Sequence, residues 1–277
     1  MPRGHLTLMN PQISTSVTSV IGKVPYRMAF AGGWIDQPFA SKLNPDPPGS
    51  VVVVGLEPTC RYMDRAGMAT STRRVALKLW NGALPDRDPG ELMRELYSCE
   101  NEGKPEPSGS QDMAGLIYPG VNRLDYDYEF EGGYFPVHIE SNNDPGVAHW
   151  LEDVIHMVPI AQRPEVYGPL GEKRLDPGWI RRLGESGKQC FDAIVKKDMK
   201  GLGASMNECM KCWEALLPHT VRHPAITVDL PGILAYYQSR YAGAMYSGCG
   251  GGYLYVVSEE PVPGAIRVKV RYRERRL

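Results

Sequence analysis

The chain contains the stretch Arg27-Met-Ala-Phe-Ala-Gly32-Gly33-Trp-Ile-Asp36. Residues 26–31 alternate as in a β-strand, and the two glycines then end the strand in a turn. Glycines stand beside small hydroxyl or thiol residues in two more segments, Ala66-Gly67-Met-Ala-Thr70-Ser71-Thr72 and Ser247-Gly248-Cys-Gly250-Gly251-Gly252, and Gly109-Ser-Gln-Asp112 lies between them. Such segments let a backbone approach a phosphate or a sugar closely. They therefore predict a site for a small phosphorylated or hydroxylated ligand.

The bulk composition excludes several classes of function. The chain has 277 residues, enough to bury a core and to form two domains. Its net charge of -1, from 31 basic and 32 acidic residues, creates no field that would gather nucleic acid or an anionic membrane. The six cysteines are too sparse for a small secreted disulfide framework, and we find no pattern of a membrane span or a signal peptide. We expect a cytoplasmic protein with small-molecule partners and no nucleic-acid or membrane partner; a homodimer is left open.

Helical and strand patterns alternate in both halves of the chain, which predicts an α+β architecture. Residues 154–161 are expected to form a central strand, although Pro159 does not suit that position. Residues 1–20 lack a clear period and predict a loose arm or an edge strand. Other strands are expected at 26–31, 51–56, 253–257 and 266–272, a hairpin at 121–138, and helices at 70–79, 92–100, 112–117, 177–197, 202–217 and 233–244.

The turn at Gly67 leads into the helix expected at 70–79. It delivers Thr70, Ser71 and Thr72 to a helix N-terminus, where free N–H groups and the helix dipole can bind an anion. An ordinary hydroxyl-capped helix gives the same pattern. The turn is not a Walker loop, because no Gly-Lys-Ser/Thr follows. Taken alone, these residues leave both interpretations open.

Two other features bear on the chemistry. Asp112 follows a proline-rich loop at an expected helix start, where a carboxylate could accept a hydroxyl proton or cap the helix. The four glycines within residues 247–252 cost conformational entropy on folding, which favours close approach of a second object over a purely structural role.

A zinc site is the less favoured interpretation of Cys209-x-x-Cys212 with His219 and His223 downstream. The cysteines fall inside the helical pattern at 202–217, and the second spacer is too short for a zinc finger. We expect both thiols to lie in the core.

In order and content, the glycine-marked segments resemble the GHMP kinases, the superfamily of galactokinase, homoserine kinase, mevalonate kinase and phosphomevalonate kinase. The heptose 7-phosphate kinase branch is the most similar. Residues 27–36 match its first motif, and Gly109 to Asp112 followed by Tyr118-Pro-Gly-Val-Asn122 matches a later one. The similarity continues through the strand ending near Arg163 to the Gly248 motif, so it covers most of the chain.

The resemblance implies a two-domain α+β fold, with domains at residues 1–138 and 139–277 and the active site in the cleft between them. It also implies transfer of the γ-phosphoryl group of ATP, with Mg²⁺, to a hydroxyl of a sugar or sugar phosphate, and we expect the anomeric hydroxyl. Asp112 would be the base and Arg27 would offset the developing charge. The resemblance further assigns Mg²⁺ to Ser71 and Glu100, the nucleotide to Gly67, Met68, Ala69, Thr70, Ser71 and Thr72, and the substrate to Gly32, Gly33, Asp36, Gly248, Gly250 and Gly251.

The chain also departs from the family pattern. Asp36 and Gly67 are only 31 positions apart, whereas family members have well over twice that span, including parts that help to bind adenine. Ala69 and Trp34 replace glycines or small residues, and no helix is expected after the Gly248 motif. An alternative function is therefore a catalytically weak or inactive relative that binds a sugar or sugar phosphate as a sensor or scaffold. ATP binding would distinguish the two.

Overall fold

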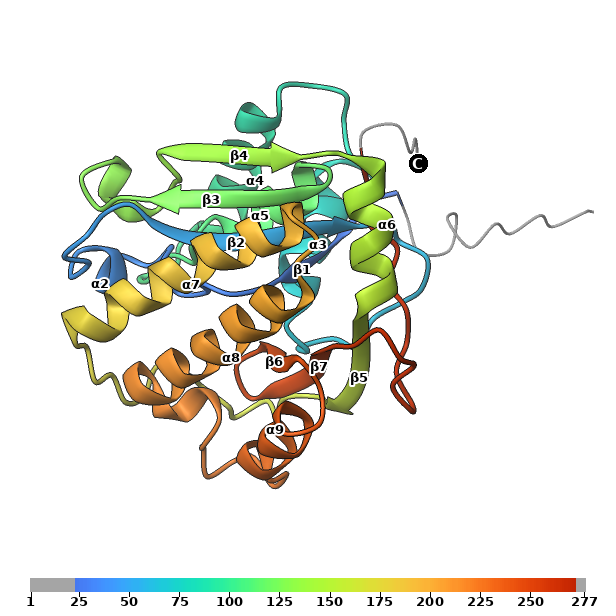
Figure 1. Cartoon of the computed structure of the whole chain (residues 1–277). Coiled ribbons are helices and arrows are strands. Elements are labelled where there is room, and N and C mark those ends of the chain that lie inside the picture. The colour runs from blue at the N-terminus through green and yellow to red at the C-terminus, as the bar shows by residue number, and fades with distance from the viewer. Residues whose placement is uncertain (1–22, 273–277) are drawn as a thin grey trace, which may run out of the picture.

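The computed structural model describes residues 23–272, which contain two antiparallel sheets. The first sheet has the order β1 (Tyr26–Ala29), β2 (Gly49–Leu56), β3 (Val121–Tyr126) and β4 (His138–Asn142) (Figure 1). All eight residues of β2 are buried, as expected for an inner strand that is covered on both faces. Strand β1 ends at Ala29, and the chain then turns through Gly32-Gly33.

Helices cover both faces of the first sheet (Figure 1). On one side lie α3 (Thr70–Leu79), α4 (Pro89–Asn101) and α5 (Gln111–Ile117), and on the other lies α7 (Pro177–Val195) with α8 (Met199–Leu216) beside it. Helix α7 approaches β2 very closely at Gly187, where a Cβ atom would lie only 1.9 Å from the Ser50 carbonyl oxygen. Glycine is required there because any side chain would collide with the strand backbone.

The second sheet has the order β5 (Ile155–Ala161), β7 (Gly251–Val257) and β6 (Gly243–Gly248). Helix α6 (Pro145–Val154) leads into β5, and α9 (Leu230–Gln238) packs beside β6. Residues near the C-terminus bond to both sheets: the Ile266 amide donates to Met157 O at 2.9 Å, and the Arg271 amide donates to Gly55 O at 2.8 Å. Buried residues of both sheets and of the helices belong to one hydrophobic core.

The helix starts follow a shared local rule. The N-cap residues of α4, α6, α7, α8 and α9 are all aspartates whose carboxylates accept a backbone N–H three residues on, which satisfies one of the free N–H groups of a helix N-terminus. Helix α3 differs, because its N-cap residue Ala69 makes no such bond. The remaining short elements are α2 (Pro38–Ser41) and two 3₁₀ turns, Glu131–Gly133 and Pro218–Thr220.

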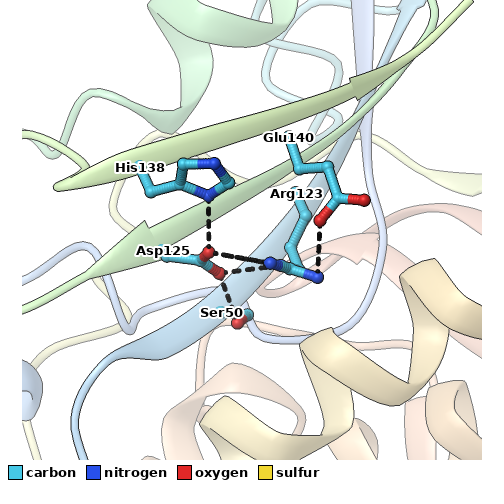
Figure 2. A network of polar contacts seen from close by, with 5 residues as sticks. All are labelled: Ser50, Arg123, Asp125, His138 and Glu140. Atoms are coloured by element: carbon cyan, nitrogen blue, oxygen red, sulfur yellow. Dashed lines mark hydrogen bonds and ion pairs between the residues drawn. The ribbon is translucent and has the colours of Figure 1, made fainter.

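A polar network around the buried Asp125 joins strands β2, β3 and β4 of the first sheet (Figure 2). Asp125 accepts hydrogen bonds from Ser50 Oγ at 2.7 Å and from Arg123 Nε at 2.9 Å, and its other oxygen lies 3.1 Å from His138 Nδ1. Arg123 also pairs with Glu140 at 2.9 Å. Burial alone would raise the pKa of Asp125, but the bonds from Arg123, Ser50 and His138 outweigh it and hold the pKa below its ordinary value.

The α+β prediction is confirmed, but three predicted elements are wrong. Residues 155–161 form an edge strand rather than a central one, and Pro159 lies at a register shift, where the missing N–H is tolerated. The helix predicted at 233–244 ends at Gln238, and residues 243–248 form β6 instead. Residues 266–272 contribute isolated bridges at Ile266 and Val270 and no strand.

The division of the chain at residue 138 stays a prediction. Strand β4, which begins at His138, pairs with β3, so a boundary after Asn142 would keep the first sheet whole. The prediction for residues 1–20 lies outside the described residues.

Candidate functional site

The predicted segments converge on one cleft of about 630 Å³. The cleft is lined from the first half of the chain by the β1 turn, the Gly67 turn and the start of α5, and from the second half by residues around Arg163 and Gly248. Six of the predicted site residues on its wall are Arg27, Gly33, Asp36, Gly67, Asp112 and Gly248.

One end of the cleft is the N-terminus of α3. Ala69, Thr70 and Ser71 line the cleft there. Gly67 has φ +75° and Ala69 has φ +52°, so the chain makes a left-handed turn just before the helix. The first helical bond is from the Arg73 amide to Ala69 O at 2.8 Å, and no side chain caps the preceding N–H groups. These groups and the helix dipole give the turn the character of an anion site.

The second and third glycine segments pack backbone to backbone. A Cβ atom at Gly67 would lie 2.5 Å from the Ser247 carbonyl oxygen, and one at Gly252 would lie 2.4 Å from Ala66 O. The Ser247 hydroxyl donates to Ala66 O at 2.6 Å. Glycines in residues 247–252 therefore have a packing role, which the sequence interpretation underestimated, and the contact joins the two halves of the chain at the cleft.

Asp112 faces the cleft from the first turn of α5. Its carboxylate forms an ion pair with the Arg27 guanidinium and accepts a hydrogen bond from Thr72 Oγ1 at 3.4 Å. Helix α5 has Ser110 as its N-cap residue, so the helix-cap interpretation of Asp112 is wrong. Thr72 belongs to the first turn of α3, which places this carboxylate beside the uncapped helix N-terminus.

Asp36 also lines the cleft and is almost completely covered, with 1% of its surface exposed. Gln111 Nε2 donates to its carboxylate at 3.0 Å, and Gly109 packs so closely that a Cβ atom there would lie 1.9 Å from Oδ2. Burial raises the pKa of Asp36 to about 6, against the opposing effects of hydrogen bonds and of Arg27. Burial also lowers the pKa of the Arg27 guanidinium to about 10.

The two residues assigned to Mg²⁺ differ in their surroundings. Ser71 is exposed on the cleft wall. Glu100 is not among the cleft-lining residues: its Oε1 atom faces Lys104 at 3.7 Å, and its Oε2 atom is buried without a hydrogen-bond partner. An unpartnered carboxylate oxygen fits a cation ligand in chemical type. Residues 23–272 contain no group of three His, Cys, Asp or Glu side chains arranged to hold a metal, so phosphate oxygens would have to complete the coordination.

Several predicted residues lie behind the wall. Gly32 packs on the Ser50 backbone, and Met68 is fully buried, where its sulfur accepts a bond from Tyr255 Oη at 3.1 Å. Gly250 leaves room for the Tyr167 ring, because a Cβ atom there would lie 2.7 Å from Cζ. None of these three residues lines the cleft, and Thr72 and Gly251 do not line it either.

The structure adds residues that the sequence interpretation did not assign. Arg65 and Arg163 line the cleft although they are about a hundred residues apart in sequence. Gln111 also lines the cleft. The sequence interpretation included it in the Gly-x-Gln-Asp segment but gave it no role of its own. Trp34 also lines the cleft, and its φ is +85°, a conformation that glycine adopts without strain. The sequence signal for this position was that a tryptophan stands where the family has a glycine or a small residue.

Cys209 and Cys212 are both fully buried in α8, as expected for core thiols. Burial raises the pKa of the Cys212 thiol to about 12. Within residues 23–272, no helix combines the length and the apolar character that crossing a membrane requires.

Comparison with solved structures shows a GHMP kinase-like fold. A D-glycero-D-manno-heptose 1-phosphate kinase from Bacteriodes thetaiotaomicron aligns over 91% of this chain and 96% of its own, with a TM-score of 0.56 and 11% identity. The galactokinase of Lactococcus lactis, complexed with galactose, aligns over 85% and 84%, with a TM-score of 0.53 and 12% identity. Mevalonate diphosphate decarboxylase from Staphylococcus aureus aligns over 91% and 96%, with a TM-score of 0.51 and 12% identity.

No protein-family model matches the sequence, and no curated protein matches it at a significant level. Because the three structures include a decarboxylase as well as kinases, the fold alone does not determine the reaction.

Proposed function

We propose that this protein is an ATP-dependent kinase that phosphorylates a hydroxyl group of a sugar or sugar phosphate. The observation that carries the proposal is the position of Asp112, a carboxylate bonded to Thr72 in the first turn of α3, next to the uncapped N-terminus that the Gly67 turn precedes. A proton acceptor beside an anion site is the pair of features that phosphoryl transfer to a hydroxyl needs.

The residues present fit a nucleotide's phosphates better than they fit the base. The Gly67 turn and the N–H groups before Arg73 would hold the phosphates, and Ser71 with Glu100 would hold Mg²⁺. When bound, Mg-ATP supplies the phosphoryl group and a metal charge that offsets the phosphate charges. Residues 37–66 consist of α2, β2 and connecting loops, which leave little material for a base-binding wall.

Asp112 accepts the hydroxyl proton in this proposal. Its two oxygens are fixed by Arg27 and Thr72, so the carboxylate is positioned before a substrate arrives. Arg27 is itself held by a bond from Nη1 to Gly67 O at 3.2 Å, which places a buried positive charge beside the phosphate turn. Positioning and charge neutralisation account for most of the catalysis of phosphoryl transfer, because the transition state is loose.

The acceptor sugar would bind against Asp36 and Gln111. Gln111 Oε1 is buried without a hydrogen-bond partner, and it lies in the cleft wall beside the Asp36 carboxylate. A sugar hydroxyl is a donor of the kind that Gln111 Oε1 lacks, and the Asp36 carboxylate can accept a further hydrogen bond from a second hydroxyl. We expect phosphorylation at the anomeric hydroxyl.

The direct test is an ATP-dependent phosphorylation assay with a panel of hexoses, heptoses and their monophosphates, followed by ³¹P NMR of the product. Transfer to the anomeric oxygen, lost in Asp112→Asn, is the expected result. Transfer that persists in Asp112→Asn at a wild-type rate would contradict the assigned base.

The alternative function is a sugar or sugar phosphate sensor without turnover, and the short span between Asp36 and Gly67 favours it. We expect nucleotide affinity to be weak for a kinase, with little discrimination between ATP and GTP, because little of a base pocket remains. Calorimetric titration with Mg-ATP and Mg-GTP measures both. Tight, adenine-selective binding would remove the sensor alternative, whereas sugar binding with no nucleotide binding would support it.

A further inference from the structure

A second, smaller cavity of about 190 Å³ shares no lining residue with the cleft. It is bounded by the start of α4, the end of α5 and the last residues that the structure describes. Its charged lining residues are Arg87 and Arg271. Much of the remaining wall is apolar and includes three prolines, which carry no N–H group: Leu84, Pro85, Pro89, Leu92, Ile117 and Pro119.

Arg271 is a buried cation in this wall, with 8% of its surface exposed. Among residues 23–272, no Asp or Glu oxygen lies within 4.0 Å of its guanidinium. Its Nη2 atom donates to Ile117 O at the end of α5, and its Nε atom is buried without a hydrogen-bond partner. Burial lowers the pKa of the Arg271 guanidinium to about 10. A buried charge without a counter-charge costs free energy, and an anion bound beside it would recover part of that cost.

Other arginines show that an unpaired guanidinium is not the rule in this protein. Arg87, the second arginine of the cavity wall, forms an ion pair with Glu95. Arg27 in the cleft is buried to a similar extent and forms an ion pair with Asp112. The charge at Arg271 is therefore the one in this cavity that remains available to a ligand.

The backbone of Arg271 is fixed on both sides. Its amide donates to Gly55 O at 2.8 Å, and its carbonyl oxygen accepts from the Gly120 amide at 2.5 Å. The side-chain bond to Ile117 O adds a third attachment. A donor group that is held in place before binding loses little further entropy when a ligand arrives.

The size and the lining of the cavity indicate the chemical class of the ligand. A protein cavity of about 150 Å³ can hold a benzene molecule, and this cavity is larger. The apolar wall favours a hydrocarbon group, and a guanidinium group favours a planar carboxylate. A phosphate dianion fits less well, because one arginine would leave half of its charge unpaired against an apolar wall.

We propose that this cavity is a second ligand site, which binds a small molecule with a single carboxylate on a compact apolar body and pairs the carboxylate with Arg271. The inference does not rest on the proposed kinase function, because the site shares no residue with the cleft.

The test is calorimetric titration of the full chain with benzoate as the probe, and with benzamide, acetate and inorganic phosphate for comparison. We expect benzoate to bind with a dissociation constant of about 1 mM or lower. It should bind about tenfold or more tightly than benzamide, which lacks the charge, and than acetate, which lacks the ring. Arg271→Gln should remove the preference for benzoate over benzamide. Arg222→Gln is the matched control, because Arg222 pairs with Glu214 and lines neither the cavity nor the cleft.

Amide chemical shifts of the wild-type chain locate the probe without any variant, so the test stays decisive even where Arg271→Gln does not fold. Benzoate should perturb the amides of Leu92, Ile117 and Arg271. Perturbations centred on Gly67 and Ser71 would assign benzoate to the anion site of the cleft and overturn the proposal. Unchanged benzoate affinity in a folded Arg271→Gln, tighter binding of phosphate than of benzoate, or no benzoate binding at about 10 mM would also overturn it.

Discussion

Two buried aspartates in the first half of the chain have opposite electrostatic environments. Asp125, in the sheet network, accepts bonds from Ser50, Arg123 and His138, and its pKa is lowered (Figure 2). Asp36, in the cleft wall, has the Gln111 amide as its side-chain donor, and burial raises its pKa to about 6. Asp36 is the more deeply buried of the two, so burial outweighs its hydrogen bonds, whereas the bonds to Asp125, chiefly those from Arg123, outweigh its burial. A buried carboxylate stabilises the fold only where its partners exceed the cost of burial.

The same contrast holds for the neighbours of the two aspartates. Around Asp125, Arg123 is shared between two carboxylates. In the cleft wall, Arg27 Nε and Gln111 Oε1 are buried without hydrogen-bond partners. Unsatisfied buried polar groups cost free energy, and a ligand that pairs with them recovers it. The sheet network contributes to folding, whereas the cleft wall retains groups suited to binding.

The largest effect is expected from Asp112→Asn. Loss of the proton acceptor should reduce turnover by about 10²–10⁴-fold, on the order of 3–5 kcal/mol in activation free energy. Nucleotide and sugar affinities should change little, since asparagine keeps the shape and can still accept the Thr72 bond. Steady-state kinetics with direct binding measurements separates the two effects. As a control, Asp127→Asn removes a carboxylate in the turn after β3 and should keep full activity.

Asp125→Asn should have the next largest effect, on stability. It leaves Arg123 without its buried partner and should lower the free energy of unfolding by about 2–3 kcal/mol at neutral pH. Because the pKa of Asp125 is lowered in the fold, its stabilisation is present above an unfolded pKa of about 3.9 and is lost as pH falls below it. The variant and the wild type should therefore converge in acid, as measured by urea unfolding.

Glu140→Gln is the matched control in that network. Glu140 pairs with the same Arg123, but its side chain is 49% exposed, so solvent screens the pair and the loss should be below about 1 kcal/mol. A loss as large as that of Asp125→Asn would show that burial does not set the difference.

Asp36→Asn should act in the opposite direction. The folded pKa of about 6 exceeds the unfolded value, so the folded state binds more protons between about pH 4 and 6, and stability falls as pH rises through that window. Removing the charge should raise stability by about 1–2 kcal/mol at neutral pH and by nothing below about pH 4. Sugar affinity should nevertheless weaken, a trade-off typical of binding sites. Destabilisation at neutral pH would contradict this account.

Local signals in the sequence account for most of the correctly predicted elements. The Gly67 turn and the spacing of Val75, Ala76 and Leu79 give the bounds of α3. The dipeptide Asp144-Pro145 marks the start of α6, because an aspartate cap followed by proline is typical of a helix N-terminus. The sequence analysis nevertheless predicted no helix there. Strand β6 was missed because its residues 243–247 are all buried, so they show no alternation of polar and apolar residues.

The sequence predicted those residues of the candidate site that belong to recognisable motifs. It did not predict the residues that only the tertiary structure brings to the cleft. Arg27, Asp36, Gly67 and Asp112 lie in glycine-marked segments, and all line the cleft. The Arg65 and Arg163 pair depends on backbone carbonyls that meet only after folding, so no spacing indicates it. The sequence showed that Trp34 and Ala69 replace glycines or small residues of the family pattern. The free-energy cost of these replacements depends on their backbone angles, which only the structure gives.

Ala69→Gly tests that cost and should have the smallest effect. Ala69 has φ +52° and ψ +31°, a left-handed conformation that costs a non-glycine residue roughly 1–2 kcal/mol. Glycine avoids this cost but loses more entropy on folding, by roughly 0.5–1 kcal/mol. The net result should be a stabilisation of about 0.5 kcal/mol in urea unfolding. Ala76→Gly makes the same substitution within α3 and should instead destabilise by about 1 kcal/mol or more. Equal destabilisation by both variants would show that Ala69 does not hold the left-handed turn, and the anion site at the α3 N-terminus would then lose its geometric basis.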